Sequence, residues 1–155
     1  MATRHGNIIT LSTLLKYLEP EVIRFIYTKR PEKQRNLELS KIYHFVNDFD
    51  FAEKVYFGIE KPKNEKEEIK LKKSYELAML ENIPETFPNR LSFSVLVKII
   101  QKFPESEWER IIKRRVKEEH AVEYNMKRIY LIKNYVNDFL HKRNTKTQNT
   151  EEGRL

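Results

Sequence analysis

The sequence contains no cysteine, and this absence excludes several kinds of chemistry at once. A chain without thiols cannot form disulfides, hold a metal through thiolate ligands or use a cysteine nucleophile. Glycine is also scarce, with three residues in a chain of 155. So few glycines argue against a turn-rich all-β fold and against a glycine-rich loop that wraps phosphate groups.

Long apolar runs are missing as well. No uninterrupted apolar run approaches the roughly 20 residues that a membrane-spanning helix needs. The stretch 1–11 lacks a basic region followed by a long apolar segment, so it does not have the pattern of a signal peptide. We therefore expect a cytoplasmic protein with no membrane partner.

Charged residues are abundant instead. They make up 34% of the sequence, and the net charge is +7 at pH 7. The surplus is greatest in residues 91–155, where fourteen Lys and Arg stand against nine Asp and Glu. A surplus of this size favours polyanion partners such as RNA. Charge alone does not separate this interpretation from ordinary solvation of exposed helix faces.

The spacing of the apolar residues predicts an all-α fold. They recur at intervals of three or four, which is the period of a helix with one buried face, and no strand of normal length can be defended. We predict a bundle of six or seven helices with short connections. The polar end of the chain, 144–155, lacks core residues and is predicted to be disordered. The expected helices are 11–19, 20–30, 38–57, 64–80, 92–103, 104–117 and 121–142.

Several residues mark the expected ends of these helices. Asn64 followed by Glu67 resembles a capping box, in which the asparagine side chain accepts a bond from a free amide at the helix start. Ser92 or Ser94 can cap the fifth helix in the same way. Gly58 stands just past the third helix, where a left-handed residue often ends a helix.

No constellation of catalytic or metal-binding residues is found. Asp48 and Asp50 face opposite sides of a helix, which is unsuitable for paired acid–base chemistry. No serine lies in a nucleophile-elbow pattern. No histidine has a second histidine or a carboxylate at the spacing of zinc ligands, so we expect no metal site and no independent active site. The histidines are His5, His44, His120 and His141.

Two basic clusters are better candidates for a functional site. The first, which we call the basic turn, follows the second helix and places four cations within seven residues beside Tyr27. Such a cluster suits contacts with backbone phosphates, although a helix-terminal charge cluster without a ligand is the alternative. The second basic cluster lies in the sixth helix and is open to the same two interpretations. The basic turn comprises Lys29, Arg30, Lys33 and Arg35, and the second basic cluster comprises Lys113, Arg114 and Arg115.

Five short motifs follow one another in the first 60 residues. They are GNIIT at 6–10, PEVIR at 20–24, TKRP at 28–31, VNDFD at 46–50 and VYFG at 55–58. In this order they resemble the class I lysyl-tRNA synthetases of the archaeal type, from the end of their second ATP-binding signature (KMSKS) onward. The resemblance is specific over 5–60 and weaker afterwards, through the loop with Pro84 and the helix at 128–137.

The chain departs from the family pattern at its start. The first lysine of the signature is missing, and 2–4 occupy the places of its usual serines. We therefore interpret 1–10 as a remnant of the KMSKS loop and expect the nucleotide-binding domain to be absent from this fragment. The remnant of the ATP loop comprises Arg4, His5, Gly6 and Asn7.

The resemblance implies a division of the remaining chain and a function. Residues 11–60 would be a stem-contact-like helical region, and 61–143 a helical tRNA-binding region that begins an anticodon-binding cage. The implied activity of the family is the ATP-dependent attachment of lysine to tRNA(Lys). We expect this chain alone to be inactive and to bind neither ATP nor DNA. A separate catalytic subunit could supply the missing domain. The predicted tRNA contacts are Arg24, Lys29, Arg30, Lys33, Arg35, Lys113, Arg114 and Arg115.

Two other functions stay open at this point. The chain could be a non-catalytic helical module that binds protein, which an apolar patch on the first two helices would favour. It could also be a decayed synthetase remnant without a function, because the loop at 1–5 departs from the signature.

Overall fold

The computed structural model describes residues 10–29 and 38–140. The described part contains seven α-helices and no strand, which confirms the predicted all-α fold. The predictions for the loop remnant at 1–9 and for the tail at 144–155 fall outside the described residues. The helices are α1 (Leu11–Leu14), α2 (Pro20–Lys29), α3 (Ile42–Tyr56), α4 (Glu65–Met79), α5 (Phe93–Lys102), α6 (Glu105–Val116) and α7 (Glu119–Tyr135). A 3-10 turn, η3 (Leu39–Lys41), precedes α3, and a π-helical turn, η4 (Val136–Leu140), extends α7.

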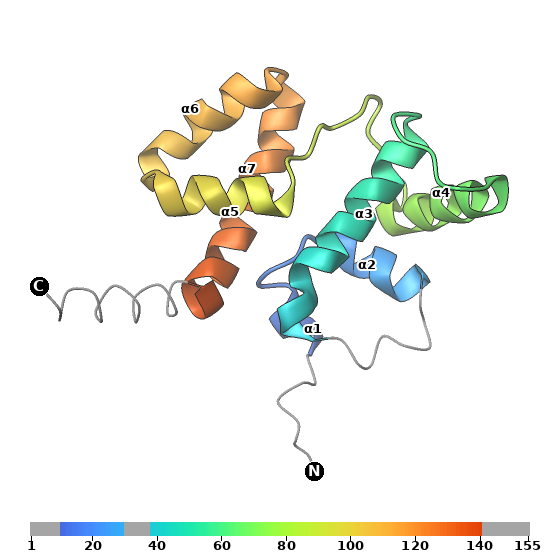
Figure 1. Cartoon of the computed structure of the whole chain (residues 1–155), viewed down its shortest axis with the longest axis horizontal. Helices are drawn as coiled ribbons and strands as arrows, with labels where there is room; N and C mark the ends of the chain where they lie inside the picture. Colours follow the sequence, from blue (N-terminus) through green and yellow to red (C-terminus); the bar gives the residue numbers. More distant parts are fainter. Residues whose placement is uncertain (1–9, 30–37, 141–155) are drawn as a thin grey trace, which may run out of the picture.

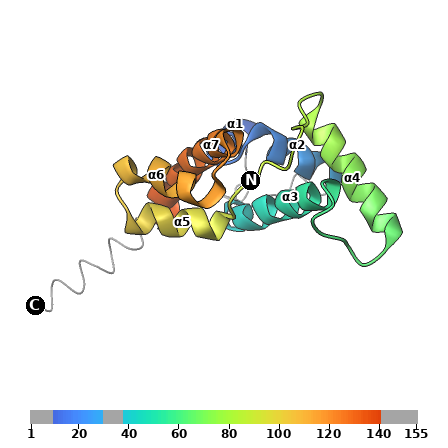
Figure 2. The ribbon, with the colours of Figure 1, turned by 90° about the horizontal axis from the view of Figure 1, so that it is seen from above.

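The helices form two lobes that lie side by side along the longest axis (Figures 1 and 2). The N-terminal lobe holds α1 to α4, with α2 and α3 both packed on α4. The C-terminal lobe holds α5 to α7, with α5 and α6 packed on α7. We call residues 81–92, which connect α4 to α5, the crossing segment. The helix α4 lies at one end of the molecule and α6 at the other.

Aromatic side chains fill the centre of the N-terminal lobe. Phe49 of α3 packs edge-on against Phe25 of α2, with ring centres 5.8 Å apart, and lies 5.6 Å from the ring of Tyr75 in α4. All three side chains are buried. Large buried rings of this kind remove much apolar area from water and hold the three helices together.

A second aromatic group joins the two lobes. Tyr17, in the connection between α1 and α2, packs edge-on against Tyr135 at 5.7 Å and against Phe139 at 5.6 Å. Its hydroxyl donates a bond of 2.6 Å to Asp138. Burial, followed by this bond to the carboxylate, raises the pKa of Tyr17 to about 12. The phenol is therefore held in its protonated, hydrogen-bonding form.

The residues predicted to mark three helix ends are confirmed in these roles. The side chain of Asn64 accepts a bond of 2.8 Å from the amide of Glu67, and the side chain of Ser92 accepts one of 3.2 Å from Val95. Gly58 has φ +78°, the left-handed value expected at the end of α3. These contacts satisfy amides and carbonyls that a helix leaves free at its ends.

Candidate nucleic-acid interface

The basic turn begins at the C-terminal end of α2. Lys29 is the last residue of this helix, and its ammonium group lies 5.8 Å from the centre of the Phe25 ring. A cation is favoured here because the free carbonyls of a helix C-terminus carry partial negative charge. Three members of the basic turn and all members of the ATP-loop remnant lie outside the described residues. They are Arg30, Lys33 and Arg35, and Arg4, His5, Gly6 and Asn7.

Arg24 has a structural partner. Its Nε donates a bond of 2.6 Å to the carbonyl of Ala78, in the last turn of α4, and its side chain is half-buried. Carbonyls in the last turn of a helix have no partner within that helix, so Arg24 satisfies one of them and ties α2 to α4. The tRNA contact proposed for Arg24 stays a prediction.

The second basic cluster occupies the last turn of α6. Lys113, Arg114 and Arg115 are all exposed there. Lys113 forms an ion pair of 3.0 Å with Glu109, one helical turn earlier. Arg114 and Arg115 have no carboxylate partner within residues 10–29 and 38–140. Their guanidinium groups are therefore available for phosphate oxygens, which they can bind through two parallel hydrogen bonds.

Lys29, the described member of the basic turn, does not lie near the second basic cluster. The end of α2 belongs to the N-terminal lobe and α6 to the far end of the C-terminal lobe (Figures 1 and 2). A single phosphate cannot contact both Lys29 and the second basic cluster. An extended polyanion, whose charges repeat along its backbone, could contact them at separate places.

A buried ion-pair network, which was not predicted from the sequence, lies between the lobes. Arg128 of α7 is at its centre, with a side chain that is 1% exposed. Its two terminal nitrogens each donate a bond of 2.8 Å to the carboxylate of Asp50 in α3. Its Nε donates a bond of 3.0 Å to Glu19, just before α2, and one terminal nitrogen also bonds the carbonyl of Leu91 at 3.0 Å. One side chain therefore joins both lobes and the crossing segment.

Arg90 of the crossing segment is the second cation of the network. It donates bonds of 2.8 Å to Glu19 and 3.0 Å to Glu21, and its Nε lies 3.1 Å from a carboxylate oxygen of Glu53. Its guanidinium group is held between two aromatic rings, 5.1 Å from the centre of Phe49 and 4.6 Å from that of Tyr124. Stacking on rings suits a guanidinium group, which is planar and weakly hydrated.

The charges of the network are unequal. Four carboxylates, from Glu19, Glu21, Asp50 and Glu53, face the two guanidinium groups. Burial opposes ionisation of Glu19, but the attraction of Arg128 and Arg90 outweighs it and lowers the pKa of this carboxyl. At Glu53 burial prevails over the attraction of Arg90 and raises the pKa. The hydroxyl of Tyr75 donates a bond of 2.7 Å to Glu53, which partly replaces its lost hydration.

A sequence signal for part of this network exists. Arg128 stands among Asn125, Ile129 and Ile132, at the spacing of the buried face of α7. Glu53 stands in the same way on the apolar stripe of α3. A charged residue at a core position is rarely fully buried unless it is paired, so each of them pointed to a buried partner. The identity of the partners depends on the fold, because they are spread from residue 19 to residue 128.

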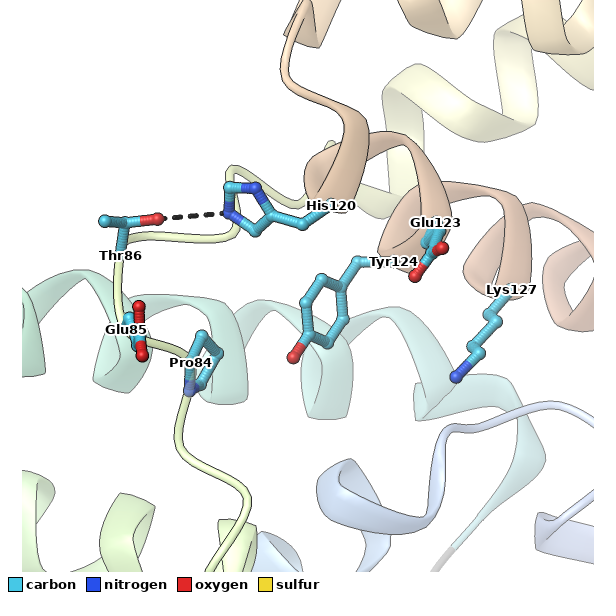
Figure 3. Close-up of a pocket in the computed structure, with 7 residues that line it drawn as sticks. All are labelled: Pro84, Glu85, Thr86, His120, Glu123, Tyr124 and Lys127. Carbon is cyan, nitrogen blue, oxygen red and sulfur yellow. Dashed lines mark hydrogen bonds between the residues drawn. The ribbon is translucent and has the colours of Figure 1, made fainter.

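A pocket of about 420 Å³ opens beside the network, between the crossing segment and the start of α7 (Figure 3). The side chain of Thr86 lies 3.2 Å from Nε2 of His120. Lining groups of both charge signs are present. The hydroxyl–imidazole bond is exposed, and in the described part of the chain no third group bonds His120 to orient it as a base for Thr86. No group of three or more His, Asp or Glu that could hold a metal occurs among the described residues. The lining residues are Pro84, Glu85, Thr86, His120, Glu123, Tyr124 and Lys127.

Comparison with known proteins decides the family. The sequence model of the family described as tRNA synthetases class I (K) matches residues 1–81, which is more than half of the chain. The chain belongs to this family. The matched part includes α2, α3 and α4, and with them the four carboxylates of the network, whereas Arg90 and Arg128 follow it.

Curated relatives in this family are lysine–tRNA ligases. The chain is 42% identical to that of Thermococcus kodakarensis over 103 residues, which are 65% of this chain and 19% of the relative. It is 38% identical to that of Pyrococcus furiosus over 125 residues, with 79% and 23% covered, and 35% identical to that of Pyrococcus horikoshii over 149 residues, with 90% and 28% covered. The predicted resemblance is confirmed, and the chain spans only 19% to 28% of the length of these relatives. In the described part of the chain, no helix is both long and apolar enough to cross a membrane.

Proposed function

We propose that this chain is the tRNA-contacting helical part of a class I lysine–tRNA ligase. The observation that carries the proposal is the match to lysine–tRNA ligases along most of the chain, which extends to 90% of it in the relative from Pyrococcus horikoshii. The complete enzyme would attach lysine to tRNA(Lys) at the expense of ATP, in the cytoplasm, where translation takes place. The stem-contact-like region at 11–60 and the tRNA-binding region at 61–143 are part of the same proposal.

The exposed cations of α6 support the tRNA contact. Arg114 and Arg115 are unpaired in the part of the chain that the structure describes, and they extend from a helix whose other face is buried on α7. Contacts from such cations to phosphates position an RNA without reading its sequence. The buried network supports this role indirectly. It fixes α7 relative to α2 and α3, so that cations on the two lobes are held at constant separation.

Catalysis is not assigned to the described residues. Lysine activation would take place on the rest of the enzyme, whether in the same polypeptide or in a separate catalytic subunit. The ATP-loop remnant, Arg4 to Asn7, lies outside the described residues, so we propose no contact with ATP for the described part.

Binding of a tRNA(Lys) transcript tests the proposal. We expect affinity that falls with salt, because each phosphate contact releases counterions. The triple variant K113E/R114E/R115E should weaken binding by about tenfold or more and lower the salt slope by about one for each lost contact. Gel shift or fluorescence anisotropy at several salt concentrations measures both quantities.

A matched control is available on α4. Lys66, Lys70 and Lys73 are three exposed lysines on one helix, so K66E/K70E/K73E changes the net charge by the same amount at another place. We expect this variant to retain most of the tRNA affinity. Equal losses in the two variants would mean that net charge, rather than a site on α6, governs binding. An affinity without salt dependence would contradict the proposal as a whole.

A further inference from the structure

The pocket between the crossing segment and α7 has an aromatic wall that is held in place. Tyr124 projects from α7 toward the crossing segment, which contributes Pro84 to the same pocket (Figure 3). One face of the Tyr124 ring lies on the guanidinium group of Arg90, which is 4.6 Å from the ring centre. Arg90 is fixed in turn by its ion pairs with Glu19 and Glu53. The ring is therefore a preorganised platform, and because it is only half-buried its second face is available to a flat ligand.

Tyr124 also has a hydroxyl group without a partner. Burial raises the pKa of this phenol, so the group is protonated at neutral pH and can donate a hydrogen bond. The hydroxyl forms no hydrogen bond within residues 10–29 and 38–140. A tyrosine hydroxyl that is taken out of water usually has a partner, and a ligand in the pocket would supply one.

Polar groups of both charge signs surround the ring. The carboxylates of Glu85 and Glu123 accept hydrogen bonds, whereas the ammonium group of Lys127 donates them. None of the three forms an ion pair in the described parts of the chain, and His120 is engaged by Thr86. A ligand that satisfies both kinds of group needs donors and acceptors on a flat body. Nucleobases with an exocyclic amino group have this composition, whereas uracil offers no amino group.

A second cavity connects this pocket to the second basic cluster. It lies between α6 and α7, has a volume of about 850 Å³ and shares Glu123 and Lys127 with the first pocket. Lys113 of the second basic cluster also lines it. Carboxylates line this cavity as well, so it connects the two places by open space and not by a continuous positive charge. An RNA backbone held at the second basic cluster can therefore bring one base to Tyr124.

We propose that the pocket at Tyr124 receives a single unpaired RNA base that carries an exocyclic amino group and stacks on the tyrosine ring. Proteins bind unpaired bases in this way, on an aromatic side chain and through hydrogen bonds to the base edges. The volume of about 420 Å³ lies in the range of small-molecule sites. The inference rests on the proposed function, because it takes RNA as the source of the base.

Titration of the isotope-labelled full chain with uncharged nucleosides, followed by NMR, tests the inference. Adenosine, cytidine and uridine carry no phosphate, so attraction to the basic clusters does not contribute. We expect adenosine and cytidine to shift the amide resonances of 84–86 and 120–127, with dissociation constants of about 1–10 mM for one stacked base. Uridine should bind about threefold more weakly, because it lacks the amino group that pairs with a carboxylate.

Substitutions of Tyr124 separate stacking from hydrogen bonding. Y124L removes the ring and should lower the affinity for cytidine about tenfold. Y124F keeps the ring and should lose only about threefold, through the missing hydroxyl. Because Tyr124 also contacts Arg90, circular dichroism at the temperature of the titration establishes that both variants are folded. Equal affinities of folded Y124L and the wild type would overturn the inference.

The carboxylates are tested without touching the buried network. E85Q/E123Q keeps the size of two exposed side chains and removes their charge. We expect it to abolish the preference for cytidine over uridine, since the preference depends on pairing with the amino group. E65Q/E76Q makes the same change at two exposed positions of α4 and should leave the preference as in the wild type. An unchanged preference in E85Q/E123Q would overturn the assigned role of the carboxylates and with it the choice of base.

The results for nucleosides and for tRNA distinguish this inference from the proposed function. Salt-dependent tRNA binding without any nucleoside-induced shift at 84–86 and 120–127 would overturn the base site and leave the proposed function standing. Nucleoside binding at the pocket by a chain without tRNA affinity would contradict the proposed function, and with it RNA as the source of the base. Shifts that are spread over all helices and persist in Y124L would mean unspecific stacking on exposed rings and would also overturn the inference.

Discussion

Arg128 is the residue on which the described fold depends most directly. It is the largest of the fully buried side chains, and its bonds reach Glu19, Asp50 and the carbonyl of Leu91. Replacing it by methionine preserves much of the volume, leaves Asp50 without its cation and leaves Glu19 with Arg90 alone. We expect R128M to lower the free energy of unfolding by about 3–5 kcal/mol, measured by urea denaturation.

The exposed Arg115 provides the comparison for this prediction. R115M makes the same chemical change where no buried partner exists, and it should alter the free energy of unfolding by less than about 0.5 kcal/mol. Similar effects in the two variants would mean that the network adds nothing beyond ordinary packing.

Tyr17 gives the fold a dependence on alkaline pH. Its pKa is raised above the ordinary value of 10 to about 12, by burial and then by the bond to Asp138. The protonated form is therefore favoured in the folded chain. The contribution of this bond is fully present below pH 10 and is lost as the pH rises through about 12.

The variant Y17F isolates this effect, because it keeps the ring and removes the hydroxyl. Urea denaturation from pH 8 to 12 should show a steeper loss of stability in the wild type than in Y17F. Parallel curves would show that other groups cause the alkaline loss.

The individual side chains also mark the limit of what the sequence could predict. From the sequence, Asp50 was considered only as a candidate for paired acid–base chemistry and was found unsuitable. Its role as a buried ion-pair partner was not predicted. Its partner Arg128 is 78 residues away, so no local pattern joins the two. Arg24 was predicted as a tRNA contact, and its bond to the Ala78 carbonyl could not be anticipated because it depends on how α2 packs against α4.

At the scale of single elements, the end of α6 is strained. Lys117 has φ +62°, and the amide of Glu118 donates a bond of 2.6 Å to the carbonyl of Val116 across it. A bond that spans one residue with positive φ is a classic γ-turn, which is rare and costly for a residue with a side chain. Glycine adopts such φ values without this penalty.

We therefore expect K117G to stabilise the chain. The expected gain in the free energy of unfolding is about 0.5–1 kcal/mol, since relief of strain outweighs the greater freedom of glycine in the unfolded chain. Thermal denaturation would measure it. The variant K113G, inside the regular part of α6, is the counterpart and should lose about 1 kcal/mol. A destabilised K117G would show that the turn is not strained.

The helices themselves were predictable, and their ends less so. The apolar period of three or four located most of the α-helices, because each buries one face. The helix α4 was located by its capping box instead, and the first expected helix, 11–19, ends at Leu14. The third expected helix, 38–57, begins with the 3-10 turn Leu39–Lys41 instead of a regular α-helical turn. The seventh expected helix, 121–142, begins at Glu119, and a π-helical turn follows it at the end of the described residues. Such local changes of hydrogen-bond pattern depend on packing, as in the bond from Tyr135 to the Leu39 carbonyl, which crosses between the lobes.

At the scale of the whole molecule, the two lobes are expected to unfold together. Trp108, the sole tryptophan, reports on the C-terminal lobe, whereas circular dichroism reports on all helices. Coincident transitions by the two probes indicate a single cooperative unit. We expect coincidence in the wild type and separate midpoints in R128M, because this variant removes the ion pairs that join the lobes.

The aromatic contacts of Tyr17 with Tyr135 and Phe139 are the alternative source of this cooperativity. Coincident transitions in R128M would assign the coupling to these rings. R115M, which leaves both kinds of contact intact, should behave as the wild type.

The unequal charges of the buried network have one more consequence. Where all four carboxylates are ionised, acidic groups are in excess inside the fold, and the remaining residues then carry more positive charge than the net charge of +7 indicates. Unfolding releases these carboxylates to the solvent and dilutes that positive charge. If the chain contacts tRNA as proposed, the polyanion should bind the folded form in preference to the unfolded one and stabilise it by mass action. The proposed RNA affinity would then be thermodynamically linked to folding through side chains that lie inside the fold.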